Sequence, residues 1–117
     1  MTPMPKERMR RVNEAVREVL STAIGKDLKD PRIGFVTVTA VDTSPDLRHA
    51  RVYVSVFGVE KERADTLAGL ASSHGYLQGR IASELRLKNT PQLDFHYDES
   101  VERGARITEI LRQEENE

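Results

Sequence analysis

Residues 72–79, SSHGYLQG, interrupt a region that otherwise has the pattern of one long helix. A glycine inside a helix lowers its stability by about 0.5–1 kcal/mol relative to alanine. Gly75 and Gly79 therefore predict a break in the helix, a close approach of its backbone to another element, or both. We expect Gly75 to adopt a backbone conformation that a Cβ atom disfavours. Apolar residues recur at helical spacing on both sides of the break: Ala64, Leu67, Leu70 and Ala71 before it, and Leu77, Ile81 and Leu85 after it.

The chain before this region predicts a helix and a β-hairpin. Residues 5–24 place their apolar side chains in one stripe at helical spacing, and Gly25 suits the C-terminal cap. Residues 34–44 and 48–58 are rich in β-branched residues and read as strands. The short turn sequence SPDL between them requires antiparallel pairing. Side chains of the second strand alternate, with Val52, Val54 and Val56 on one side and Arg51, Tyr53, Ser55 and Phe57 on the other.

The remaining chain completes an α+β architecture. NTPQ ends the broken helix, and residues 93–98, LDFHYD, predict a third strand. The expected product is a three-stranded sheet with helices packed on one face, the other face being open to solvent or to a partner. A length of 117 residues suits one domain. We expect residues 1–98 to form its core, and residues 99–117 to add a C-terminal helix and an acidic tail.

Composition and charge limit the cellular compartments and the kinds of partner that suit this chain. The chain has no cysteine, no apolar run of transmembrane length and no apolar stretch after the charges of its N-terminus. We therefore expect a cytoplasmic monomer without a membrane partner. The net charge is −1, but residues 1–59 carry ten Lys/Arg and seven Asp/Glu, whereas residues 60–117 carry eight and twelve. This asymmetry allows a basic face on a near-neutral protein, although solvated helix faces explain it as well.

The sequence gives no positive support for an enzyme. His49, His74 and His96 are the only histidines, and their spacing matches no metal site. The chain has no nucleophile elbow, no phosphate-binding glycine loop and no dinucleotide fingerprint. We therefore predict no catalytic residue, no metal and no cofactor.

Nucleic-acid binding has more support, because a bend can present backbone N–H groups and a helix N-terminus to a phosphate. Basic residues flank the expected sheet and bend in three groups, and an ordinary solvated face remains the alternative for each. The aromatic residues fall mostly on strand faces that we expect to be core, so phosphate contacts should dominate over base stacking. The three groups are Arg8, Arg10 and Arg11; Arg48 and Arg51; and Arg80, Arg86 and Lys88.

Several long segments resemble one known family. KDPRIGFVTVTAVDTSPDLRHARVYVSVFG, HGYLQGRIASELRLKNTPQLDFHYDES and GARITEIL are together similar to bacterial ribosome-binding factor A over nearly the whole chain. The resemblance implies a type II KH-like fold with the order helix, strand, strand, helix, kink, helix, strand. It places the interhelical kink, an Ala-x-Gly motif in the family, at Ser73-His74-Gly75. Family members commonly have an arginine where this chain has Gln78, with Arg80 two residues further on.

The resemblance also implies a function. The family is not enzymatic; it binds the free 30S ribosomal subunit and promotes late maturation of 16S rRNA, including its 5′ end, and growth in the cold. Assembly GTPases are further candidate partners. We rank Arg80, Arg86 and Lys88 first for RNA contact, because KH-like folds turn the neighbouring helix N-terminus toward nucleic acid. A generic KH-type module for single-stranded RNA is the alternative function.

Overall fold

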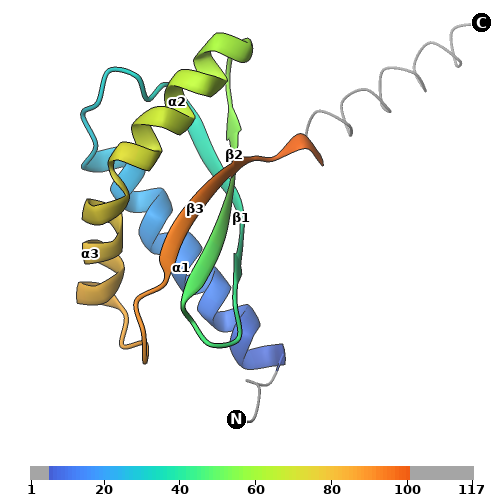
Figure 1. Cartoon of the computed structure of the whole chain (residues 1–117), viewed down its shortest axis with the longest axis vertical. Coiled ribbons are helices and arrows are strands. Elements are labelled where there is room, and N and C mark those ends of the chain that lie inside the picture. Colours follow the sequence, from blue (N-terminus) through green and yellow to red (C-terminus); the bar gives the residue numbers. More distant parts are fainter. Residues whose placement is uncertain (1–5, 101–117) are drawn as a thin grey trace, which may run out of the picture.

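The structure is a computed structural model that describes residues 6–100. The predicted element order is confirmed over this range. The predicted C-terminal helix lies outside the described residues from position 101 onward. The elements, shown in Figure 1, are α1 (Lys6–Lys26), β1 (Val36–Thr43), β2 (His49–Val56), α2 (Glu60–Ser72), α3 (His74–Glu84) and β3 (Gln92–Tyr97).

The three strands form one mixed sheet in the order β1-β2-β3. β1 and β2 pair antiparallel, with Val38 opposite Val54 and Asp42 opposite Arg51. β3 returns parallel to β2, because α2 and α3 carry the chain back to the end of the sheet where β2 begins. The register of β1 shifts between Val38 and Ala40, so Thr39 forms a β-bulge.

Helices cover one face of the sheet, as predicted. The inward side chains of β2 are almost fully buried, whereas Arg51 on the opposite face is exposed. They meet the apolar stripe of α1 and the buried residues Leu70, Leu77 and Ile81 of α2 and α3. Figure 1 shows α2 and α3 along one side of the strands, with α1 crossing the sheet. No helix within residues 6–100 is long and apolar enough to cross a membrane.

A buried leucine anchors the hairpin turn between β1 and β2. Leu47 has a φ of 61°, the left-handed region that few non-glycine residues adopt, and its side chain is only 3% exposed. Burying a leucine contributes about 1.5–3 kcal/mol, which is enough to offset the cost of about 1–2 kcal/mol of that conformation. The Ser44 hydroxyl and the Arg48 N–H both donate hydrogen bonds to Asp46 and lower the pKa of its carboxyl. The buried Leu47 and the hydrogen bonds to Asp46 together order the turn, and they fix the backbone position of Arg48.

The expected roles of two glycines were wrong. α1 continues to Lys26 and the Asp27 N–H donates to the Ala23 carbonyl, so Gly25 lies in the last turn and is not a cap. Gly75 lies inside α3 without a positive φ, and a Cβ atom there would meet nothing within 4 Å. The break falls on Ser73, the first residue of the kink predicted at Ser73-His74-Gly75, with φ −95° and ψ 5°. The close approach that we expected of the glycine pair belongs to Gly69, where a Cβ would lie 2.6 Å from Ile33 Cγ1.

Gly79→Ala should raise the free energy of unfolding by about 0.5–1 kcal/mol, because Gly79 lies in the interior of α3. A Cβ atom at this position would enter open space. Chemical denaturation of the variant and the parent measures the difference. An unchanged or lowered stability would show that the glycine has a packing role that its surroundings do not reveal.

Candidate nucleic-acid interface

The break between α2 and α3 consists of Ser73 alone. Its N–H contacts the carbonyls of Gly69 and Leu70, and its hydroxyl donates to Gly69. The Leu77 N–H donates back to the Ser73 carbonyl, so α3 begins at once in a new direction. His74 Nδ1 lies 2.7 Å from the Ala71 carbonyl. These hydrogen bonds fix the backbone at the break and therefore the direction in which α3 leaves it.

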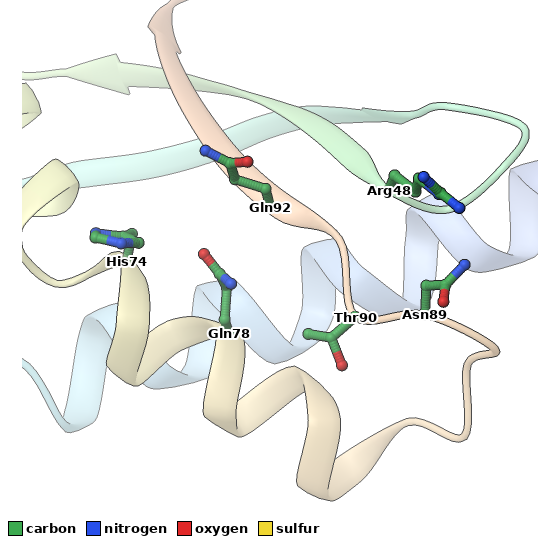
Figure 2. Close-up of a pocket in the computed structure, with 6 residues that line it drawn as sticks. All are labelled: Arg48, His74, Gln78, Asn89, Thr90 and Gln92. Carbon is green, nitrogen blue, oxygen red and sulfur yellow. The ribbon is translucent and has the colours of Figure 1, made fainter.

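A polar hollow of about 440 Å³ lies between this break and the start of β3. Figure 2 shows His74 at one end, Arg48 and Asn89 at the other, and the amides of Gln78 and Gln92 between them. His74 and Gln78 are four residues apart on α3 and therefore share one face of the helix. The remaining side chain that lines the hollow is Thr90.

Two hydrogen bonds hold the far wall of this hollow in place. The Gln92 N–H donates to the Arg48 carbonyl at 2.8 Å, which starts β3 beside β2. Asn89 Nδ2 donates to the Asp46 carbonyl at 3.1 Å and ties the loop after α3 to the hairpin turn. The hollow is thus assembled from three segments that are distant in the sequence.

A second hollow of about 220 Å³ adjoins the first and shares His74 and Gln92 with it. Its walls include the apolar side chains of Leu67, Leu93 and Phe95. We call the two hollows together the kink groove. It has an apolar end between α2 and β3, and a polar end that reaches Arg48.

The polar end can bind a nucleotide chemically. Gln78 Oε1 is buried and has no hydrogen-bond partner among the described residues, which leaves an acceptor to be satisfied. Amide side chains can both donate to and accept from the edges of unpaired bases, and a guanidinium binds phosphate through two hydrogen bonds. Arg48 lines the mouth of the groove and makes no ion pair within 4.0 Å among residues 6–100, and Asp46 is the carboxylate whose pKa its charge helps to lower.

The fold gathers much of the basic charge at one end of the molecule. The first turn of α1, the hairpin turn and the loop after α3 lie together at the lower end of Figure 1. Arg86 and Lys88 are exposed in that loop, next to Asn89 of the kink groove, and form no ion pair with another described residue. These two residues and Arg48 are therefore the cations best placed to accompany a ligand in the groove.

Arg80, which we predicted to contact RNA together with Arg86 and Lys88, has local partners. Its guanidinium lies 3.7 Å from Asp27 and 3.0 Å from Glu84. The Tyr76 hydroxyl also donates to Asp27 at 2.7 Å, and this hydrogen bond raises the pKa of Tyr76. The cluster joins α3 to the end of α1. Because two carboxylates already balance Arg80, its attraction for a phosphate is weaker than that of an unpaired arginine.

The other predicted basic residues differ among themselves. Arg10 and Arg11 share Glu7 as a partner, at 2.7 Å and 3.8 Å, whereas Arg8 is exposed and makes no ion pair within the described residues. Arg51 points away from the helices and stands between Asp42 and Asp94 on the neighbouring strands. It therefore does not belong to the kink groove.

Sequence reasoning missed the polar wall of the groove. Asn89, Thr90 and Gln92 indicated only the end of a helix, and their approach to Arg48 depends on tertiary contacts. The expectation that most aromatics are core was also wrong for Phe35, Phe57 and Tyr76, which are 84%, 82% and 48% exposed. Within residues 6–100, no group of His, Asp or Glu side chains could hold a metal ion.

The comparisons with known proteins identify the family. A family model described as Ribosome-binding factor A matches residues 8–111. The chain belongs to the ribosome-binding factor A family. The ribosome-binding factor A of Halothermothrix orenii is 46% identical over 114 residues, which cover 97% of this chain and 93% of that protein.

Solved structures of ribosome-binding factor A have the same fold. The crystal structure from Thermus thermophilus matches with a TM-score of 0.69 and 28% identity, and covers 76% of this chain and 93% of its own. A homology model of the T. thermophilus protein, fitted into a cryo-electron microscopy map of its complex with the 30S subunit, matches with a TM-score of 0.61 and 29% identity over 74% of this chain and 91% of that one. The mixed sheet and helix-kink-helix order agree with the type II KH-like fold expected of the family.

Proposed function

We propose that this chain binds the 30S ribosomal subunit during late assembly and holds a segment of 16S rRNA in the kink groove. The observation that carries the proposal is the groove itself, a polar hollow that Arg48 lines at one end and that the amides of Gln78 and Gln92 line between Arg48 and His74. Support for the partner comes from the family, since a T. thermophilus member has been fitted into a map of a 30S complex.

The proposed role is binding without catalysis. A protein that binds one arrangement of the rRNA more tightly than another shifts the population toward it by that difference in affinity. Maturation of the rRNA, including its 5′ end, would then follow because the favoured arrangement exposes the precursor to processing enzymes. This role requires no cofactor, and we propose that the chain performs it in the cytoplasm as a monomer.

Sedimentation of cell extract tests the partner. The chain should travel with free small subunits and be absent from assembled ribosomes, because it acts before the subunits join. In a strain without the protein, 16S rRNA with an extended 5′ end should accumulate, most strongly in the cold. Sedimentation with assembled ribosomes, or normal 5′ ends in that strain, would contradict the proposal.

The amides of the kink groove favour one alternative, a module that binds any single-stranded RNA. Gln78 and Gln92 can bond to base edges whether or not the RNA is part of a subunit. Competition distinguishes the two functions. A short single-stranded RNA that displaces the chain from the 30S subunit at equal concentration would favour the alternative, whereas a much weaker competitor would favour recognition of the subunit.

A further inference from the structure

The side of the sheet that faces away from the helices forms a second surface, which adjoins the kink groove at Asp94. On β2 it carries Arg51, Tyr53 and Ser55, with Phe57 just beyond the strand. The Phe57 N–H donates to the Phe35 carbonyl, so these two residues continue the pairing of Val56 with Val36. Because Val36 and Val56 point toward the core, alternation directs both phenylalanines outward. We call this surface the open face.

The phenylalanine pair is highly exposed. Phe35 is 84% and Phe57 82% accessible, and the two large apolar side chains lie next to each other just beyond the paired ends of β1 and β2. Further along the same face, the rings of Tyr53 and His96 lie 5.8 Å apart. The open face therefore offers aromatic rings at its end and in its middle.

Acidic side chains occupy the rest of the open face. Asp42 and Asp94 flank Arg51 on the adjoining strands, and the Asp94 side chain is 72% exposed. They line a hollow of about 540 Å³ together with His49 and Arg51. Asp98 accepts hydrogen bonds from Ser100 and Thr39, which lower the pKa of its carboxyl. The open face thus carries three carboxylates, of which Asp42 and Asp94 flank Arg51 and Asp94 also lies 3.1 Å from His96 Nε2. Carboxylates therefore outnumber the one arginine among these side chains, which favours cations over phosphate.

We propose that the open face docks a lysine- and arginine-rich segment of a protein. Guanidinium and ammonium groups bind aromatic faces, and they form ion pairs with carboxylates. The distance along β2 from Arg51 to Phe57 corresponds to about 20 Å, so an extended segment of about six residues spans both the acidic hollow and the phenylalanine pair. The charge favours a basic peptide over an RNA strand, although exposed aromatics alone would suit either.

This inference goes beyond the proposed RNA-binding function, and the open face shares only Asp94 with the lining of the kink groove. The molecule would then carry two complementary surfaces. The cations at the end of the molecule near Arg48 would bind RNA. The carboxylates and aromatic rings of the open face would bind a basic protein. Subunits built from RNA and basic proteins present both kinds of partner.

Fluorescence anisotropy with two labelled probes tests the inference. One probe is a decapeptide of alternating arginine and glycine, and the other is decauridine. Phe35→Leu and Phe57→Leu keep apolar volume but remove the aromatic faces, and each should weaken peptide binding about two- to fivefold. Asp42→Asn with Asp94→Asn should weaken it by a similar factor per charge. Decauridine binding should stay unchanged in the leucine variants.

The matched control is Glu114→Gln with Glu115→Gln, which removes two carboxylates outside the described residues. An equal loss of peptide binding in this control would show non-specific attraction to acidic charge and overturn the inference. So would a leucine variant that loses decauridine and retains the peptide, because the open face would then be an RNA platform. Thermal melting of each variant confirms the fold, and analytical ultracentrifugation shows whether the phenylalanine pair instead joins two copies of the chain, which would also overturn it.

Discussion

Gly69→Val should lower the free energy of unfolding by about 2–3 kcal/mol, the upper range for forcing extra atoms into a packed site. Gly69 is buried in α2, where a Cβ atom would lie 2.6 Å from Ile33 Cγ1 and 3.5 Å from Arg32 Cβ. Relief requires the segment before β1 to move away from the helix. That segment is also held by the Gly34 N–H, which donates to the Thr66 hydroxyl. Chemical denaturation at equilibrium measures the loss.

Gly75→Val and Gly79→Val are matched controls in the neighbouring helix. Both positions have open space where the side chain would begin, and valine and glycine differ little in helix propensity. Their free energies of unfolding should stay within about 0.5 kcal/mol of the parent, the usual range for exposed substitutions. A large loss of stability in Gly75→Val, with none in Gly69→Val, would contradict this account. It would show that Gly75 is the glycine whose backbone conformation or packing excludes a side chain.

Arg48→Ala combined with Lys88→Ala should weaken binding to the 30S subunit about tenfold or more, since each removed group is a charged hydrogen-bond donor. The slope of log affinity against log salt should fall by roughly 0.7–0.9 for each phosphate that the variant no longer neutralises. Arg48 lines the kink groove, and Lys88 precedes its wall residue Asn89. Titration of labelled protein with purified subunits at several salt concentrations gives both quantities.

Lys26→Ala combined with Lys29→Ala is the charge-matched control, because it removes two exposed lysines at the other end of α1. Its affinity and its salt slope should stay close to those of the parent. Arg80→Ala should act mainly on stability, since Arg80 joins α3 to Asp27. Equal losses in the control would mean that binding depends on overall charge, and a larger loss for Arg80→Ala would restore the ranking from the sequence.

The elements were predictable because their patterns are local. Alternation along β2 and the stripe of α1 each place apolar side chains on one side, and the structure buries those sides. The role of each glycine was not predictable in the same way. Gly69 fits an ordinary helical pattern, and only its contact with Ile33, far away in the sequence, makes it special. Gly75 lies close to the break in the sequence, but the break itself consists of Ser73 alone.

The sequence predicts which charged residues could belong to the candidate site, but it does not predict how the structure arranges them. Arginine and lysine positions can be read from the sequence, but their ion pairs cannot, and these distinguish Arg80 from Arg48. The exposure of Phe35 and Phe57 depends on where the strands end relative to the helices, which an alternating pattern does not specify. The groove itself requires α3, β2 and the loop before β3 to be assembled.

Site-specific photo-crosslinking to purified 30S subunits tests the central claim most directly. A photoreactive phenylalanine analogue at Thr90, an exposed residue that lines the kink groove, should crosslink to 16S rRNA. The same analogue at Ser21, an exposed residue of α1 away from the groove, should give far less RNA crosslinking when the two proteins bind equally well. Strong crosslinking of the rRNA from position 21, with none from position 90, would contradict the assignment of the kink groove as the RNA-binding site.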